Sequence, residues 1–430
     1  MPEEKKTFAE YTLDTSLVEA LAKKGITQPT EIQKLMLTNL VNRQSILAIS
    51  NTGTGKTLAY LLPIMHTLLQ DDKYFYAMVI LPTRELSQQV HAVLADIGAE
   101  IGLRTSLLIG ATDLLSQGKS LAARPHIVIG TPGRINHHLR NTKGISVSSF
   151  KYLVLDECDR LLDNDFDGDI NNILEMISPK YTFLFSATLT KRVNAFKEKR
   201  MNNPLLYNVQ KDEGIPENIL QQYIYLPQKY KEMYLYSIVH NLGSRKCIVF
   251  VKTCITAERI ERILRFLGES VCSIHGNKTQ DIRTETIEMF RRGKHSILIS
   301  TDVVARGMDM DGIKVIINYD MPDGHKEYIH RIGRTGRAGE VGSSITLVTQ
   351  YDVDDFRKLE VKLNKKMDEY SVSSELIYSL VDSVDQAKRE AAMDMKEEGV
   401  GKKIKEFKKG KQGTKSAKKD HGRDRKSKSK

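Results

Sequence analysis

Short apolar runs alternate along the chain with longer segments that have helical periodicity. The run at residues 152–155, Tyr-Leu-Val-Leu, is the clearest, and it has the length and composition of a strand that is buried on both faces. Alternation of this kind predicts a parallel sheet with helices on both sides. In the first half we predict strands at 45–50, 77–81, 105–109, 126–130, 152–155 and 181–185.

The second half of the chain repeats this rhythm. Strands are predicted there at 222–226, 246–251, 271–274, 296–300, 314–318 and 344–348, followed by helix from about 353 to 395. We therefore predict an α/β protein of two tandem domains, each a parallel sheet flanked by helices. The expected divisions are a first domain at 1–210, a linker at 211–218, a second domain at 219–385, and a helical extension with a basic, disordered tail at 386–430.

The net charge of +11 is concentrated at the C-terminus. Residues 401–430 carry fourteen Lys and Arg residues against three acidic ones, which accounts for the whole excess. Such a segment has too few apolar residues to form a core, so it favours attraction to phosphate backbones or targeting to the nucleus and nucleolus. The alternative is a tail that only solvates the protein.

The composition argues against two other classes of protein. No apolar stretch approaches the roughly 18–20 residues that span a bilayer, and no apolar segment follows the first residues, so we expect neither a membrane protein nor a secretory signal. The four cysteines are scattered without metal-ligand spacing. Reduced thiols in an intracellular protein are therefore expected.

Residues 50–57, Ser-Asn-Thr-Gly-Thr-Gly-Lys-Thr, lie between a predicted strand and a predicted helix. This is the context of a phosphate-binding loop, in which Gly53 and Gly55 let backbone N–H groups turn towards phosphates. Lys56 would reach the β- and γ-phosphates, and Thr57 would bind Mg²⁺. An ordinary glycine-rich turn is the alternative. A phosphate-containing ligand and Mg²⁺ are therefore predicted at this loop.

Two adjacent carboxylates, Asp156 and Glu157, come directly after the apolar run at 152–155. One can hold Mg²⁺ while the other activates a water molecule, although acidic residues also end strands for solubility. Upstream, the amide of Gln33 offers a donor and an acceptor that match the N6 and N7 edge of adenine. An arginine-rich run follows far downstream at 330–337. Together these features predict a nucleotide hydrolase.

From about Phe8 to Val348 the chain resembles the DEAD-box RNA helicases. The resemblance is carried by an ordered set of short motifs. They are the Gln segment at 25–33, the phosphate loop, 82–86, 131–134, the acidic box at 156–159, Ser186-Ala187-Thr188, His275-Gly276 with Gln280 and Arg283, 301–309, and 330–337. Three positions depart from the family pattern within these motifs: Ser50 opens the loop, Cys158 replaces Ala, and Ile26 stands where an aromatic often stacks on adenine. Ala111 replaces the second Gly of the pair that Gly110 begins, which puts that RNA contact in question.

The resemblance implies two RecA-like domains that bind ATP between them, and it assigns roles to single residues. Asp156 would hold Mg²⁺, Glu157 the attacking water, and Arg334 and Arg337 the γ-phosphate as arginine fingers. Ser186, Thr188 and His330 would couple the nucleotide to RNA. The implied nucleotide contacts are Phe8, Gln33, Thr52, Gly53, Thr54, Gly55, Lys56, Thr57, Gly307 and Asp309.

The implied RNA contacts lie in loops that follow predicted strands. Hydroxyls, backbone N–H groups and single arginines suit phosphates and 2′-OH groups, so binding independent of base sequence is expected. These contacts are Pro82, Thr83, Arg84, Glu85, Gly110, Thr131, Pro132, Gly133, Arg134, Gln280, Arg283, Thr301 and Asp302.

Segments outside these motifs indicate which helicases are most similar. Short stretches at 123–126, 137–138, 231–236, 348–353, 364–367 and 387–390, with the lysine-rich end, resemble a nucleolar group that acts in small-ribosomal-subunit assembly and pre-ribosomal RNA processing. An RNA clamp gated by ATP, and a helicase of mRNA export or translation initiation, remain as alternatives. A monomer is expected, and a protein activator is left open.

Overall fold

The computed structural model describes residues 6–40, 43–50, 53–162, 166–209, 218–302, 310, 312–336 and 340–399. The chain divides into two compact units, a first unit with the described residues up to 209 and a second unit with those from 218 onward. Each unit is described by itself. The predicted linker lies outside the described residues except for Asn218, and the predicted tail lies outside them from residue 400.

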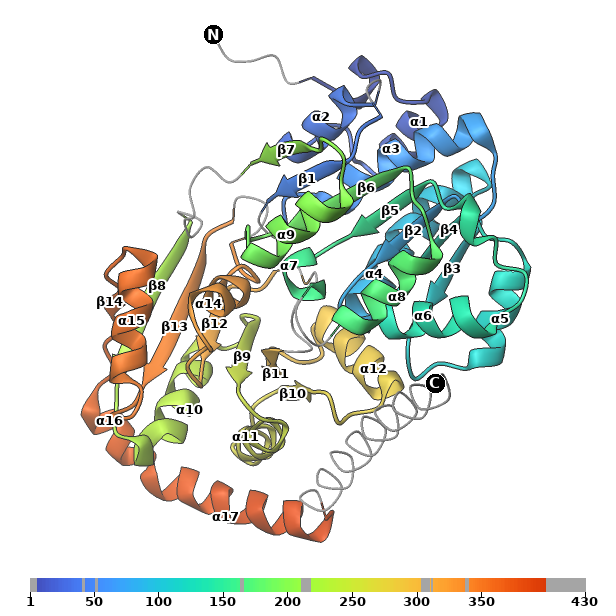
Figure 1. The fold of residues 1–430 in the computed structure, drawn as a ribbon. Coiled ribbons are helices and arrows are strands. Elements are labelled where there is room, and N and C mark those ends of the chain that lie inside the picture. Colours follow the sequence, from blue (N-terminus) through green and yellow to red (C-terminus); the bar gives the residue numbers. More distant parts are fainter. Residues whose placement is uncertain are drawn as a thin grey trace, which may run out of the picture. The chain divides into compact units, whose positions relative to one another are not determined.

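The first unit is built on a parallel sheet with the strand order β3-β4-β2-β5-β6-β1-β7 (Figure 1). Six strands follow the predicted ranges to within one residue at each end. β7 was not predicted; it is an edge strand in which half-buried and exposed side chains alternate. The strands are β1 Ile46–Ile49, β2 Ala77–Ile80, β3 Thr105–Leu108, β4 Ile127–Gly130, β5 Tyr152–Leu155, β6 Tyr181–Ser186 and β7 Leu205–Asn208.

Helices cover both faces of this sheet because successive strand residues point to opposite sides. Val154 packs in a core with α1 Thr15–Lys23, α2 Glu31–Thr38, α3 Lys56–Asp71 and α4 Arg84–Gly98. Its neighbour Leu155 packs in a separate core with α5 Leu114–Ala122, α6 Pro132–Asn141, α7 Cys158–Leu161, α8 Asp167–Met176 and α9 Lys191–Arg200. Short 3-10 turns lie at η1 Phe8–Glu10, η2 Ala99–Ile101 and η3 Val147–Ser149.

The second unit repeats the topology of the first. Its parallel sheet has the order β10-β11-β9-β12-β13-β8-β14, so strands in equivalent places of the chain occupy equivalent places in the sheet. The strands are β8 Ile219–Tyr225, β9 Cys247–Val251, β10 Val271–Ile274, β11 Ile297–Thr301, β12 Val315–Asn318, β13 Gly342–Val348 and β14 Asp368–Glu369. The prediction of two tandem α/β domains is confirmed.

The helical region predicted from 353 to 395 is interrupted. It consists of α15 Val353–Leu363, the edge strand β14, α16 Ser374–Ser379 and α17 Val381–Glu397. The break begins at Asn364, which adopts a left-handed backbone (φ 47°) and ends α15. Among the described residues of the second unit, the helices before this region are α10 Lys231–Leu242, α11 Cys254–Phe266, α12 Gln280–Arg291 and α14 His325–Ile332, and the 3-10 turn η4 spans Gln228–Tyr230.

The predicted division between residues 385 and 386 is wrong, because it cuts through α17. Val384, Ala387 and Ala391 are buried on one side of this helix. Ala387 and Ala391 belong to the core that α10, α11 and the sheet of the second unit share. The helix is therefore an integral part of the second domain rather than an extension from it.

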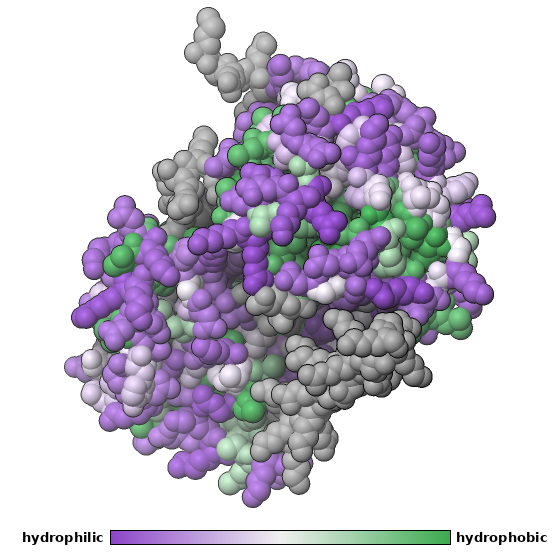
Figure 2. Space-filling view, in the orientation of Figure 1, coloured by the Kyte–Doolittle hydropathy of each residue, from purple (hydrophilic) through white to green (hydrophobic). Residues whose placement is uncertain are grey.

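The side of the molecule shown in Figure 2 is mainly hydrophilic, in keeping with apolar residues that are gathered in the cores. Among the described residues, the helices are too short or too polar to cross a membrane.

The place of α17 can be tested by changing one buried residue. Ala391 is 0% exposed, whereas Met393 on the same helix is 64% exposed. Ala391→Asp buries an unpaired carboxylate and is expected to lower the free energy of unfolding by at least about 3 kcal/mol. The control Met393→Asp should cost less than about 0.5–1 kcal/mol. Urea unfolding measures both, and equal effects would contradict a buried α17.

Candidate functional site

The phosphate loop joins β1 to α3 at the carboxyl end of the first sheet. Gly53 and Gly55 have positive φ values of 82° and 85°, which favour glycine, and α3 begins at Lys56. The Lys56 side chain is buried, and its Nζ donates to the Ser50 carbonyl at 3.2 Å. Free N–H groups at the start of a helix together with a lysine form a site for an anion. Thr52 lies outside the described residues.

Gln33 on α2 contacts this loop directly. Its Oε1 accepts from the Thr30 backbone N–H at 2.9 Å, and its Nε2 donates to the Gly55 carbonyl at 3.0 Å. A Cβ atom at Gly55 would lie 2.5 Å from this Nε2, so the contact requires glycine. The predicted reading of adenine by Gln33 stays a prediction.

Phe8 was expected to contact the nucleotide, but its ring is 2% exposed and packs in the core formed with α1 to α4. The structure therefore gives Phe8 a packing role at the start of the first unit. The contact of Phe8 with the nucleotide stays a prediction.

The acidic box begins at the carboxyl end of β5. Asp156 is buried; its Oδ1 accepts from the Glu157 N–H at 2.8 Å, and its Oδ2 accepts from the Tyr60 hydroxyl at 3.3 Å. Burial raises the pKa of Asp156, while Lys56 and these hydrogen bonds act in the opposite direction. Glu157 has a left-handed backbone, with φ at 50°, which is strained for a residue other than glycine.

The residues predicted to bind Mg²⁺ fit that ion. Magnesium prefers oxygen ligands, and Asp156 and Thr57 supply a carboxylate and a hydroxyl. Burial makes the negative charge on Asp156 costly, so a bound cation would stabilise the ionised form. The donor set of this edge therefore suits a divalent cation that is shared with a phosphate ligand.

The predicted coupling residues of the first unit are joined to the acidic box. Thr188 Oγ1 donates to Asp159 Oδ2 at 2.8 Å. Ser186 Oγ donates to the Thr188 carbonyl at 2.7 Å and accepts from the Thr188 N–H at 3.1 Å. A change at the acidic box can therefore reach the end of β6 through one side-chain contact.

The predicted RNA residues of the first unit lie after β2, β3 and β4. A Cβ atom at Gly110 would lie 2.7 Å from Arg84 Nη2, so the close approach of this arginine requires glycine. Thr83 caps α4, where its hydroxyl accepts from the Leu86 N–H at 3.3 Å, and Glu85 is buried. Ala111 has a positive φ of 62°, a strained value for alanine.

The loop after β4 places a partly buried cation, Arg134, at the same edge. Thr131 is the N-cap of α6 and Pro132 its first residue. A Cβ atom at Gly133 would lie 3.2 Å from Asp169 Oδ2. Arg134 Nη1 is buried and has no hydrogen-bond partner, and burial lowers the pKa of this guanidinium. A buried guanidinium nitrogen without a partner favours an anionic ligand such as a phosphate.

In the second unit, three predicted RNA residues follow neighbouring strands. Gln280 and Arg283 begin α12 after β10, and Arg283 Nη2 donates to Gln280 Oε1 at 2.7 Å. Thr301 ends β11 and pairs in register with Val251 of β9. All three side chains are largely buried.

Asp302 is engaged within the protein. It forms a bidentate ion pair with Arg331 of α14, with Oδ1–Nε at 2.6 Å and Oδ2–Nη2 at 2.8 Å. Arg331 Nη1 also donates to the Asp320 carbonyl at 2.7 Å. The pair holds the start of the arginine-rich run against the end of β11, and a carboxylate would repel an RNA phosphate. Sequence reasoning missed Arg331, although it stands directly after His330 in that run.

Arg334, a predicted arginine finger, is 2% exposed in this structure, and its Nε donates to the His330 carbonyl at 3.0 Å. Gly307, Asp309 and Arg337 lie outside the described residues. The roles assigned to these residues stay predictions.

Comparison with known proteins identifies the family. A DEAD/DEAH box helicase model matches residues 30–196, and a helicase conserved C-terminal domain model matches residues 230–339. The ATP-dependent rRNA helicase rrp3 of Schizosaccharomyces pombe is 40% identical over 393 residues, which cover 91% of this chain and 84% of that protein. The chain belongs to the DEAD-box family of ATP-dependent RNA helicases. The probable ATP-dependent RNA helicase DDX47 of Homo sapiens is 39% identical over 402 residues, 93% of this DEAD-box chain and 88% of the human one.

A solved structure of another helicase supports the same assignment. Mss116p bound to ssRNA and AMP-PNP is 29% identical, with a TM-score of 0.79 over 89% of this DEAD-box protein and 83% of that chain. This likeness confirms the predicted fold of two tandem RecA-like domains.

Asp302 is either a direct contact to RNA or a structural partner of Arg331, and a substitution distinguishes these two roles. Asp302→Ala leaves the buried Arg331 without its carboxylate and is expected to lower the free energy of unfolding by about 3 kcal/mol. The control Glu340→Ala breaks the exposed Lys314–Glu340 pair and should cost less than about 1 kcal/mol. Urea unfolding and RNA affinity are measured together. Unchanged stability with weaker RNA binding would favour a direct contact of Asp302 with RNA.

Proposed function

We propose that this DEAD-box protein hydrolyses ATP when RNA is bound, and that it uses the cycle to separate short RNA duplexes or remodel RNA–protein complexes. One observation carries the hydrolytic part of the proposal: the buried Lys56, in the loop after β1, and the buried Asp156, directly after β5, lie at the same edge of one parallel sheet. A cation for phosphates next to a carboxylate for a metal is the arrangement that phosphoryl transfer needs.

Each residue at this edge has a distinct task in the proposal. Lys56 and the N–H groups of the loop bind the phosphates, and Thr57 and Asp156 hold Mg²⁺, which would offset the charge on the γ-phosphate. Glu157 orients a water molecule and accepts its proton. Gln33 reads adenine.

The second unit contributes the remaining groups of the proposed nucleotide site. Gly307 and Asp309 contact the nucleotide, and Arg334 and Arg337 stabilise the charge that develops on the phosphoryl oxygens. Because both units take part, hydrolysis would depend on their coming together around ATP. His330 couples this step to RNA.

The proposed RNA contacts are to phosphates and 2′-OH groups. Arg134, which is partly buried, supports this proposal in the first unit because its buried Nη1 lacks a hydrogen-bond partner. At these edges Thr301 ends β11, and the other contacts follow strands: Thr83, Arg84, Gly110, Gln280 and Arg283. Contacts of this kind carry little base information, so the protein would bind single-stranded RNA of many sequences and prefer RNA to DNA. The solved structure of Mss116p contains ssRNA together with AMP-PNP, which supports the same type of complex.

We further propose that the cellular substrate is pre-ribosomal RNA in the nucleolus. The relative rrp3 is named an rRNA helicase, and it covers nearly the whole of this chain. The excess of Lys and Arg at residues 401–430 would add affinity for phosphate backbones that is independent of sequence.

Replacement of the proposed general base tests the chemistry. Glu157→Gln keeps the size of the side chain but cannot accept a proton, so RNA-dependent phosphate release should fall by at least about 100-fold. ATP affinity and thermal unfolding should stay close to wild type. The control Glu175→Gln changes an exposed residue of α8 and should leave the rate unchanged. A rate of phosphate release near wild type in Glu157→Gln would contradict the role of Glu157 as the general base.

The substrate class is tested separately in cells. Ultraviolet cross-linking of the tagged full-length protein should enrich pre-ribosomal RNA over messenger RNA, with a tagged Lys56→Ala variant as a comparison for nucleotide-dependent capture. Enrichment of messenger RNA instead would contradict the proposed substrate.

Displacement of one strand from a short duplex by the purified protein distinguishes a helicase from a clamp, because a clamp binds the duplex without displacing a strand.

A further inference from the structure

The loop that joins β10 to α12 leads directly into two proposed RNA contacts. It consists of residues 275–279, and Gln280 and Arg283 stand at the start of the helix that follows. Arg283 Nη2 donates to Gln280 Oε1 at 2.7 Å, so these two side chains are oriented together. The position of the loop therefore determines where α12 begins and how it presents both side chains.

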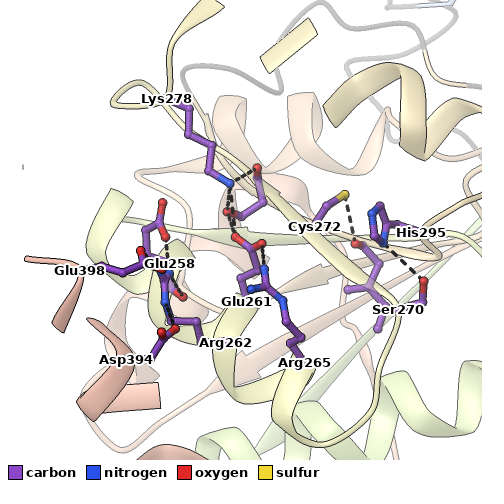
Figure 3. A network of polar contacts seen from close by, with 12 residues as sticks. Glu258, Glu261, Arg262, Arg265, Ser270, Cys272, Lys278, His295, Asp394 and Glu398 are labelled. Carbon is purple, nitrogen blue, oxygen red and sulfur yellow. Dashed lines mark hydrogen bonds and ion pairs between the residues drawn. The ribbon is translucent and has the colours of Figure 1, made fainter. Parts of the chain in front are cut away.

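Two glutamates of α11 hold this loop. Glu258 Oε1 lies 2.7 Å from His275 Nε2, and this ring nitrogen carries the proton because an ionised carboxylate can only accept. Glu261 Oε2 lies 3.3 Å from Lys278 Nζ, which also donates to the Ser273 carbonyl at 2.8 Å (Figure 3). The first and the fourth residue of the loop are thus both fixed to α11.

Each of these glutamates also pairs with an arginine one turn further along α11. Glu258 pairs with Arg262, and Glu261 pairs with Arg265 (Figure 3). The two arginines differ in their surroundings, because the side chain of Arg262 is 7% exposed and that of Arg265 is 58% exposed. Loss of one partner matters far more in a buried ion pair than in an exposed one, since water cannot replace the missing charge.

Arg262 also connects the loop to α17. Its Nε donates to Asp394 Oδ2 at 2.7 Å, and its Nη2 donates to Glu398 Oε2 at 2.6 Å, at the C-terminal end of that helix (Figure 3). One buried guanidinium thus bridges a carboxylate of α11 and two carboxylates from the end of α17. Arg262 with its three partners, Glu258, Asp394 and Glu398, forms the Arg262 cluster.

The charge on Glu258 makes its position depend on Arg262. The Glu258 side chain is 14% exposed, and burial opposes its ionisation. Hydrogen bonds from His275 and Arg262, with the charge of Lys278, outweigh burial and lower the pKa of Glu258 to about 2. Without the guanidinium, this carboxylate would be a buried charge short of a partner and would be drawn towards Lys278 or solvent, away from His275.

The loop also holds polar atoms that the protein does not satisfy. His275 is 1% exposed, and its Nδ1 is buried without a hydrogen-bond partner. Nδ2 of Asn277 is likewise buried and unpaired. Buried polar atoms are nearly always paired, so two exceptions within three residues indicate a segment that is held in place by its surroundings rather than by its own hydrogen bonds.

We propose that the Arg262 cluster is a positioning device for RNA: it fixes the loop of residues 275–279 through His275 and takes its own position from α17. This role rests on the proposed contacts of Gln280 and Arg283 with RNA. An intact cluster holds the start of α12 ready for the strand, so RNA binds without first having to order the loop. In this way α17 takes part in RNA binding through Arg262.

Replacement of Arg262 tests the cluster. Arg262→Met keeps a long apolar side chain but removes the guanidinium, and it should raise the KM for RNA in the ATPase assay by about three- to tenfold. The kcat at saturating RNA should stay close to wild type, because the residues that contact the nucleotide are unchanged. A merely structural role predicts the reverse, since partial unfolding lowers the active fraction and therefore kcat. Fluorescence anisotropy with a labelled single-stranded RNA should show the same loss of affinity.

Arg265→Met is the matched control. It makes the same substitution three residues further along the same helix, and Glu261 keeps Lys278 as a partner. The KM for RNA should therefore stay unchanged. An equal rise in both variants would overturn the proposal, because it would trace the effect to the charge of α11 in general.

The route through Glu258 is tested by a second substitution. Glu258→Gln keeps an oxygen that can accept from His275 Nε2 but carries no charge that needs Arg262. Arg262→Met combined with Glu258→Gln should therefore recover most of the RNA affinity that Arg262→Met loses. A combined variant that binds RNA as weakly as Arg262→Met would show that Arg262 does not act through Glu258, which overturns the proposed route.

The contribution of α17 is measured at its own carboxylates. Asp394→Asn combined with Glu398→Gln leaves Arg262 paired with Glu258 and should raise the KM for RNA by about two- to threefold. An unchanged KM in this variant would overturn the role of α17, and it would overturn the whole proposal if Arg262→Met fails to fold. Absence of any stimulation of the wild-type ATPase by RNA would instead overturn the proposed function.

Discussion

Both units depend on a parallel sheet whose central strands are buried on both faces. Such strands have no room for unpaired charges, so charged side chains lie beyond the ends of the central strands. All pairs in both sheets are parallel, so the carboxyl ends of the strands in each unit meet at one edge. The phosphate loop, the acidic box and the predicted RNA loops all follow strands and therefore gather at these edges.

Charges at the edges are stabilised by specific partners. Asp156 is offset by Lys56 and by hydrogen bonds, yet burial still raises its pKa, which leaves a site that favours a cation. Asp302 is instead fully engaged by Arg331. The two aspartates thus have different roles, although both follow strands. Asp156 can bind a cation, whereas Asp302 fixes the helix that carries the start of the arginine-rich run.

The central strands could be predicted from the sequence because they are short, continuous apolar runs, and most loop positions because glycines and charged residues follow these runs at fixed spacing. The edge strands β7 and β14 could not, since one alternates buried and exposed residues and the other consists of Asp368–Glu369. The core position of α17 could not be predicted because its sequence is mostly polar, and the residues that pack in the core include the small Ala387 and Ala391. The buried places of Phe8 and Arg331 are tertiary effects that no local pattern reports.

The central claim is that nucleotide and RNA bind cooperatively to this protein. The most direct measurement is the affinity for a labelled single-stranded RNA, by fluorescence anisotropy, with Mg²⁺ and AMP-PNP and without nucleotide. Coupled sites should give RNA binding that is at least about tenfold tighter with the nucleotide, and Lys56→Ala should abolish the difference. Equal affinities in wild type under the two conditions would contradict the account.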